Sequence, residues 1–149
     1  IWISGIGQKT NSASFTKNEL TTLSSTVTAA NNAYKMAKIT PQEIDTAEIH
    51  DAFSVCELLA VEDLSLTEKN TGATHVRNLF NTEDRKINPR GGLIGAGHPL
   101  GATGIAQIVE ITQQLQNKAK NRQVSNAKRG LTHNMSAAAT SSTVLVLES

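Results

Sequence analysis

The segment NPRGGLIGAGHPLGATG, residues 88–104, places one histidine in a glycine-dense turn immediately before a helical pattern. Glycine has no Cβ, so the backbone of such a turn can approach a ligand closely. Pro99 fixes its own φ and disfavours helical geometry at His98, which holds the imidazole on a rigid turn. Unpaired N–H groups at the start of the following helix attract an anionic atom. The segment therefore predicts a base held beside developing negative charge. The alternative is a tight structural loop in which His98 only hydrogen-bonds to nearby backbone.

Apolar periodicity around this turn switches between two residues and three to four, which is typical of alternating strands and helices. Thr40-Pro41-Gln42-Glu43 is a capping-box sequence and predicts a short helical turn. Residues 67–86 are polar without periodicity, and we expect a long surface excursion there. Strands are expected at 2–6, 46–50, 130–134 and 143–147, and helices at 54–66 and 103–118. A further amphipathic helix is predicted by the three-four spacing of Leu20, Leu23, Val27, Ala30, Tyr34 and Ala37. This order of elements predicts an α/β layered domain.

Composition narrows the class of protein. The 149 residues suffice for one domain, and because the chain starts at Ile1 we expect it to be part of a longer product. A formal net charge of +1 gives no general reason to expect nucleic acid or a membrane surface as a partner. No apolar run approaches the roughly 20 residues that span a bilayer. Cys56 is the only cysteine, which suits a reducing, cytoplasmic compartment. The four histidines, His50, His75, His98 and His133, are scattered without the spacing of metal ligands.

Several blocks resemble, in the expected order, the C-terminal half of the thiolases. INPRGGLIGAGHPLGATG looks like their Gly-His-Pro block, and EIHDAFSVCELLAVEDL resembles the second motif of archaeal and sterol-carrier-protein-type thiolases. WISGIGQ, LTTLSSTVTAANNAYKMAKITPQEID and KRGLTHNMSAAATSSTVLVLE extend the resemblance over nearly the whole chain. It implies one thiolase C-terminal domain over residues 1–149, with a mixed five-stranded sheet covered by helices as half of an αβαβα architecture. It also implies an N-terminal half, absent from this chain, that bears the nucleophilic cysteine. Helix 103–118 or helix 54–66 should then expose apolar surface.

The same resemblance implies an acyl-CoA C-acyltransferase that performs Claisen condensation, or thiolysis of acetoacetyl-CoA or a 3-ketoacyl-CoA. His98 would activate the cysteine and line an oxyanion hole for the enolate, which suits an imidazole with an ordinary pKa of about 6.5. His50 stands where many thiolases have an asparagine that holds a water of the same hole; the alternative is a histidine that caps local backbone beside Asp51. Thiolases need no cofactor beyond their CoA thioesters, and they usually form dimers or tetramers. The remaining expected substrate and oxyanion residues are Gly97, Asn134 and Ser136.

Two features depart from the thiolase pattern. Ala52 and Asn134 stand where thiolases carry the cysteine that acts as acid and base on the second substrate. Cys56, about one helical turn beyond Ala52, is either a small buried hydrophobe or a displaced catalytic thiol. Ser136-Ala137-Ala138-Ala139 replaces a glycine-rich turn whose first N–H contributes to the thioester oxyanion hole. A positive φ at an alanine of this turn would cost roughly 1–2 kcal/mol.

These departures leave two alternatives to an acyltransferase open. One is retro-aldol cleavage of an acyl-CoA, which needs oxyanion stabilisation but no thiolate relay. The other is a non-catalytic scaffold that binds acyl-CoA. The likeness to archaeal thiolases also allows assembly with a hydroxymethylglutaryl-CoA synthase and a small OB-fold partner.

Overall fold

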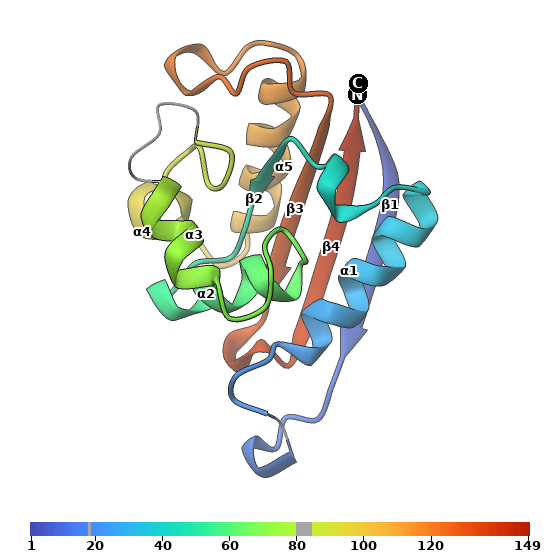
Figure 1. Ribbon diagram of the computed structural model, residues 1–149, viewed down its shortest axis with the longest axis vertical. Helices are drawn as coiled ribbons and strands as arrows, with labels where there is room; N and C mark the ends of the chain where they lie inside the picture. The colour runs from blue at the N-terminus through green and yellow to red at the C-terminus, as the bar shows by residue number, and fades with distance from the viewer. Residues whose placement is uncertain (18, 80–84) are drawn as a thin grey trace.

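A mixed sheet forms the middle layer of the computed structural model, which describes residues 1–17, 19–79 and 85–149. Within these residues the sheet has four strands in the order β1-β4-β3-β2 (Figure 1). β1 (Trp2–Thr10) pairs antiparallel with β4 (Ser141–Glu148), and β4 pairs antiparallel with β3 (Arg129–Met135). β2 (Thr46–Glu48) runs parallel to β3. The thiolase resemblance implied five strands, but at the β2 edge Ile87 adds only a single parallel bridge to Ala47.

Helices cover both faces of this sheet, so the predicted α/β layered domain is confirmed. α1 (Ser24–Ala37) lies along β1 and β4 with α2 (Ser54–Asp63) beside it, and α5 (Thr103–Leu115) lies behind β3 and β2 (Figure 1). The shorter α3 (Gly72–Leu79) and α4 (Gly92–Ala96) lie near the β2 edge (Figure 1). Single 3₁₀ turns are η1 (Phe15–Lys17), η2 (Pro41–Glu43), η3 (Lys120–Arg122) and η4 (Ala137–Ala139).

Several boundaries differ from the predicted ones. β1 continues to Thr10 instead of ending at residue 6, because its backbone pairs with β4 as far as Ser141. Leu20 lies outside α1, which begins at Ser24. The capping box is confirmed at η2, where the Thr40 N–H donates to Glu43 Oε2 at 2.8 Å.

The surface excursion predicted over 67–86 is wrong for residues 72–79, which form α3. The Gly72 N–H donates to Glu62 Oε1 at 2.8 Å, which ties the start of α3 to α2. Ala73 and Val76 do stand at helical spacing, but α3 is only eight residues long, so the pattern is short beside the polar residues around it. Residues 80–84 of the same segment lie outside the described residues.

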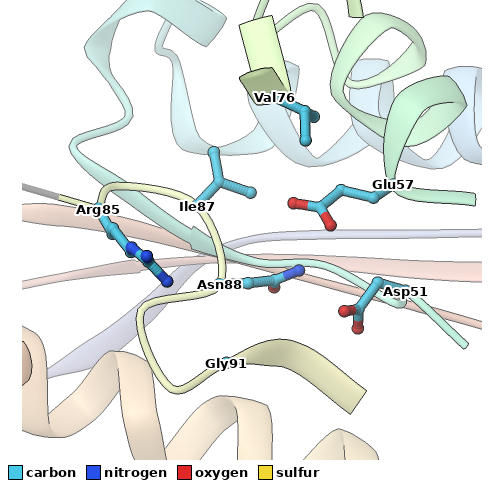
Figure 2. Close-up of a pocket in the computed structure, with 7 residues that line it drawn as sticks. All are labelled: Asp51, Glu57, Val76, Arg85, Ile87, Asn88 and Gly91. Carbon is cyan, nitrogen blue, oxygen red and sulfur yellow. The ribbon is translucent and has the colours of Figure 1, made fainter. Parts of the chain in front are cut away.

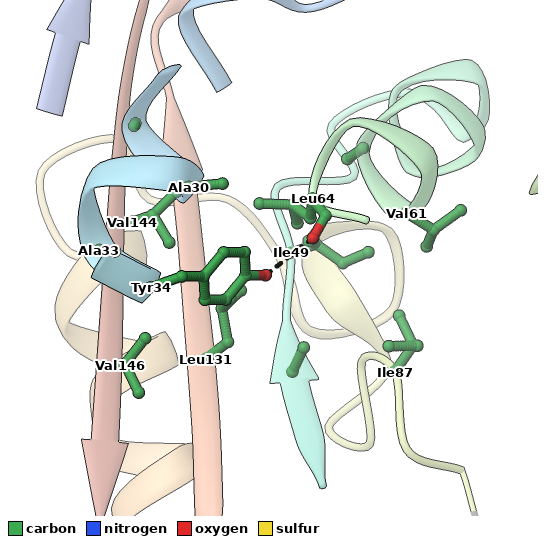
Figure 3. Close-up of a cluster of buried hydrophobic side chains, with 13 residues drawn as sticks. Ala30, Ala33, Tyr34, Ile49, Val61, Leu64, Ile87, Leu131, Val144 and Val146 are labelled. Carbon is green, nitrogen blue, oxygen red and sulfur yellow. Dashed lines mark hydrogen bonds between the residues drawn. The ribbon is translucent and has the colours of Figure 1, made fainter. Parts of the chain in front are cut away.

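Two separate apolar cores pack the helices against the sheet, one on each face. The larger core joins α1, α2, β3, β4 and the chain near Ile87 (Figure 3). Inside it, the Tyr34 hydroxyl donates to the Leu64 carbonyl at 2.8 Å, which satisfies a polar group that burial would otherwise penalise (Figure 3). The smaller core, on the α5 side, contains Ile111, Leu115, Val124, Ala127 and Leu147.

Apolar surface remains uncovered on the α5 side. Ile105 is 64% exposed and Val109 48% exposed, although both lie on α5. Across the sheet, Ile6 pairs with Leu145, which packs against the α5 core, so Ile6 faces the same side and is also exposed. The predicted apolar surface on helix 103–118 is therefore confirmed. Exposed apolar patches of this kind mark interaction sites.

Close contact between β1 and α1 depends on Gly7. A Cβ at Gly7 would stand 1.8 Å from the carbonyl oxygen of Ala29, which is backbone and cannot yield as a side chain can. We expect Gly7→Ala to lower the free energy of unfolding by at least about 2 kcal/mol, measured by urea denaturation. Gly95→Ala is the control, because a Cβ there meets nothing within 4 Å. An unchanged midpoint for Gly7→Ala would contradict the close packing of α1 on β1.

Candidate active site

The glycine-dense segment folds into a short helix, a turn and the first residues of a longer helix. α4 is followed by Gly97, with a φ of 90°, and α5 begins at Thr103. Between them the Pro99 carbonyl accepts the N–H groups of Ala102 at 2.8 Å and Thr103 at 3.0 Å. These hydrogen bonds fix the turn that carries His98. The predicted histidine on a turn before a helix is confirmed.

Thr103 orients the His98 ring. Its hydroxyl lies 2.7 Å from His98 Nδ1 and donates to the Pro99 carbonyl at 3.2 Å. A threonine hydroxyl has one hydrogen; when that hydrogen lies on the Pro99 carbonyl, His98 Nδ1 donates to the Thr103 oxygen. The other ring nitrogen, Nε2, is then unprotonated in the neutral imidazole. In this ring form His98 presents a base. Thr103, whose hydroxyl holds the ring, is only 1% exposed.

His50 lies directly beyond β2 and meets His98 edge to face. The two ring centroids are 4.9 Å apart at an angle of 90°. Burial lowers the pKa of His50, and the charge of His98 lowers it further against the opposing effect of Asp51. The His50 ring is therefore neutral near pH 7. The alternative of a local cap gains no support, because His50 Nδ1 is buried without a hydrogen-bond partner.

Asp51 acts at a different helix from the one that follows it. Its Oδ1 accepts the N–H of Leu93 at 2.6 Å, so it binds the start of α4 rather than the start of α2. This bond attaches the His50 segment to the segment that carries His98.

Most of the predicted site residues line one cavity of about 410 Å³, called here the histidine cavity. His50, His98, Asn134 and Ser136 all line it, whereas Gly97 is not among the lining residues and only precedes His98. The Asn134 amide nitrogen donates to Gln107 Oε1 on α5 at 3.1 Å. The structure thus brings together residues from three segments that are far apart in the sequence.

Comparisons with known proteins give the same picture. The family model for thiolase C-terminal domain-like proteins matches residues 7–149. An acetyl-CoA acetyltransferase of Methanothermobacter thermautotrophicus is 49% identical over 121 residues, covering 80% of this chain and 32% of that protein. Sterol carrier protein 2 of Homo sapiens is 50% identical over 109 residues, covering 72% of this chain and 20% of that protein.

The chain belongs to the thiolase C-terminal domain family. The sequence resemblance is confirmed, and the domain spans about a third or less of the length of these two relatives. A chain of a solved structure, the Ltp2-ChsH2(DUF35) aldolase, superposes with a TM-score of 0.85 over 99% of this chain and 39% of that chain. At 16% sequence identity this likeness shows the shared fold.

The turn between β3 and β4 of the thiolase domain departs from the expected oxyanion geometry. The Ser136 N–H donates to the Ser141 carbonyl at 2.9 Å, so the donor expected for the thioester oxyanion is already used in the hairpin. Ala138 and Ala139 have φ values of 59° and 52°, in the left-handed region that alanine disfavours. The strain foreseen for an alanine turn is therefore present.

Cys56 lies outside the histidine cavity. It lines an adjacent cavity with Phe53, and none of the described residues that line the histidine cavity is a cysteine. Burial raises the pKa of the Cys56 thiol, so it remains protonated near neutral pH. A low pKa is what a reactive cysteine requires, and Cys56 has the opposite environment.

Buried polar side chains behind the site were not found by sequence reasoning. His133 Nε2 lies 3.0 Å from the Thr26 hydroxyl, which in turn lies 2.9 Å from the Ser142 hydroxyl. Complete burial, followed by the charge of His50, lowers the pKa of His133 to about 3, so this ring stays neutral. Gln107 Nε2 donates to the His133 carbonyl at 3.0 Å. The sequence offered one signal for these buried groups: Thr26 on α1 and Gln107 on α5 are polar residues at otherwise apolar positions.

A separate, smaller cavity of about 90 Å³ lies beside Asp51 (Figure 2). Burial, and then the charge of Asp51, raises the pKa of Glu57 to about 7. Asn88 Oδ1 accepts the Ile49 N–H at 2.7 Å, and its amide nitrogen points toward the Asp51 and Glu57 carboxyl groups (Figure 2). Residues of this cavity support the end of β2, and none of its lining residues lines the histidine cavity.

Residues 1–17, 19–79 and 85–149 lack two features. No helix in these ranges is long and apolar enough to cross a membrane. In the same ranges, no three His, Cys, Asp or Glu side chains form a group that could hold a metal ion.

Replacing the Thr103 hydroxyl tests the ring orientation of His98. We expect the wild-type domain to hold His98 as the Nδ1–H form, and Thr103→Val to lose that preference because valine cannot accept the Nδ1 hydrogen. Long-range ¹H–¹⁵N correlation spectra of the imidazole report the two ring forms directly. Thr103→Ser keeps a hydroxyl and should retain the wild-type pattern. A valine variant with unchanged ¹⁵N shifts would show that Thr103 does not set the ring form.

Relief of the strained turn gives a stability prediction. Ala138→Gly removes a left-handed penalty of about 1–2 kcal/mol but adds about 0.5–1 kcal/mol of unfolded-chain freedom. We therefore expect a net gain of up to about 1.5 kcal/mol in the free energy of unfolding. Ala137→Gly is the matched control, because φ is not positive there, and it should destabilise. Equal effects of the two changes in urea denaturation would refute strain at Ala138.

Proposed function

We propose that this chain is the C-terminal domain of an acyl-CoA C-acyltransferase, which cleaves or forms 3-ketoacyl-CoA thioesters. The observation that carries the proposal is the open cavity in which the His98 and His50 rings meet at 4.9 Å. His98 offers an unprotonated Nε2, and His50 is neutral and offers a ring N–H or a bound water. A base next to a neutral hydrogen-bond donor suits chemistry in which a proton leaves and an enolate forms.

In this proposal an N-terminal half supplies the cysteine, and His98 Nε2 takes its proton. The thiolate attacks the 3-keto carbon, the C2–C3 bond breaks, and acetyl-CoA leaves as its enolate, which takes up the proton that His98 holds. A second CoA thiol then cleaves the acyl-cysteine. His50 stabilises the enolate oxygen, either by its ring N–H or by a held water. No group beyond the CoA thioesters is required.

The uncovered face of α5 is where we place that N-terminal half. Ile105 and Val109 are large apolar side chains that water surrounds in this domain alone. Burying them releases about 25 cal/mol per Å² of apolar surface. The relatives named above are three to five times longer than the matched stretch, which leaves ample chain for such a half in those proteins. The N-terminal half would also supply an oxyanion donor, because the Ser136 N–H is already bonded within the hairpin.

A retro-aldol reaction is the second candidate, and the absence of a thiol among the described residues of the histidine cavity favours it. In that reaction His98 Nε2 takes the proton of a 3-hydroxyl group, the C2–C3 bond breaks, and an aldehyde or ketone leaves with an acyl-CoA enolate. His50 would serve the enolate oxygen as before. No cysteine is needed for these steps.

The test measures thiolysis of acetoacetyl-CoA by the whole protein in the presence of CoA. We expect formation of acetyl-CoA, and we expect His98→Ala to lower kcat/KM by about 10²–10⁴ because the base is lost. His75→Gln is the matched control, since His75 lies on α3 away from the histidine cavity. Its activity should stay near wild type.

The outcomes separate the candidates. Undiminished thiolysis in His98→Ala would contradict the proposed role of His98. No thiolysis by the wild-type protein, together with aldehyde or ketone release from a 3-hydroxyacyl-CoA, would replace the acyltransferase by the retro-aldolase. If neither substrate reacts, acyl-CoA binding without catalysis remains, as a scaffold requires.

A further inference from the structure

We infer that the domain carries an acyl-chain subsite beside the histidine pair and selects thioesters of medium-length aliphatic acids over acetyl thioesters. The inference rests on the proposed function, because it assigns the chain of the same acyl-CoA. The subsite is a cavity of about 260 Å³, called here the acyl cavity. Its apolar side chains include Leu20, Leu23, Ala52, Phe53, Cys56 and Met135.

The acyl cavity adjoins the histidine cavity. The two have five lining residues in common, and His50 is the one that also contacts the His98 ring. Ala52 and Ala137, also shared, have only a methyl group at the junction. A thioester carbonyl beside the histidines would therefore direct its alkyl chain past Ala52 into the acyl cavity.

The chemistry of the walls suits an alkyl chain and not the nucleotide part of CoA. Leu20 is 78% exposed and Phe53 71% exposed, so two large apolar side chains at this cavity are in contact with water. An aliphatic chain laid against them would remove that surface from water. The described lining residues include no lysine or arginine, and Glu19 adds a carboxylate that repels phosphate.

The volume sets the chain length. A buried cavity of about 150 Å³ is large enough to bind benzene, a six-carbon ligand. The acyl cavity, at about 260 Å³, exceeds that size and so accommodates the six methylenes by which octanoyl is longer than acetyl. Each methylene moved out of water strengthens binding about fourfold.

This placement also accounts for Cys56, which the reaction does not use. Its thiol is half-buried on α2 and kept protonated, since burial raises the pKa. A protonated thiol behaves as a small apolar group in a wall. A larger side chain at this position would fill the acyl cavity without touching His50 or His98.

The experiment compares binding of octanoyl-CoA and acetyl-CoA to the whole protein by titration calorimetry. We expect the wild type to bind octanoyl-CoA at least about tenfold more tightly. Cys56→Phe should abolish most of this preference and leave acetyl-CoA affinity within about threefold, since the added ring occupies the chain's place. Val55→Phe places the same ring at the neighbouring position, which does not line the acyl cavity, and should keep the preference.

Equal affinity for both thioesters in the wild type would overturn the inference, and so would an unchanged preference in Cys56→Phe. If that variant does not fold, Leu20→Ser gives the same readout, because Leu20 is largely exposed and contributes little to the core. Binding requires no turnover. A protein that prefers octanoyl-CoA but cleaves no thioester refutes only the proposed function, and one that thiolyses acetoacetyl-CoA without a preference refutes only the subsite.

Discussion

The site depends on one attachment between two chain segments about forty residues apart. Residues 48–51 end β2 and carry His50, and residues 88–93 lead into α4 and the turn that carries His98. Buried side chains of each segment bond the backbone of the other, so neither histidine can move without breaking these bonds. The bonds are Arg90 N–H to Glu48 Oε1 at 3.1 Å, Ile49 N–H to Asn88 Oδ1 at 2.7 Å, and Leu93 N–H to Asp51 Oδ1 at 2.6 Å.

This attachment explains two otherwise costly features. A Cβ at Gly92 would stand 2.0 Å from Asp51 Oδ2, and φ there is 62°, so only glycine admits the carboxylate so close to the start of α4. Glu48 is completely buried, and burial raises its pKa to about 7 against the opposing effect of Arg90. Breaking such a buried arrangement by removing one partner is strongly destabilising, because it leaves polar groups without partners.

The sequence was sufficient to predict the order of most elements, because apolar spacing and turn residues carry that information locally. It was also sufficient to name His98 and His50, through the family blocks around them. It could not supply the partners of those rings. The Thr103 hydroxyl reaches His98 only after the Pro99 carbonyl has closed the turn. Likewise, the use of the Ser136 N–H follows from the register of the β3–β4 hairpin, which no spacing rule fixes. α3 was missed because its helical pattern spans only eight residues and its contacts to α2 are not visible in the sequence.

Exposed apolar surface lies next to the histidine cavity. Leu100 lines the histidine cavity and is 85% exposed, and Ile105 follows it within one turn of α5's start. Large apolar side chains in water weaken a domain's solubility and gain nothing for its own core. Their position beside His98 makes sense where a second body of protein closes over them, excluding water from the base and strengthening every polar contact made there. Under the proposed function, the assembly of the cavity and the covering of α5 would be one event, and the reactivity of His98 would depend on the same apolar contacts that hold the two halves together.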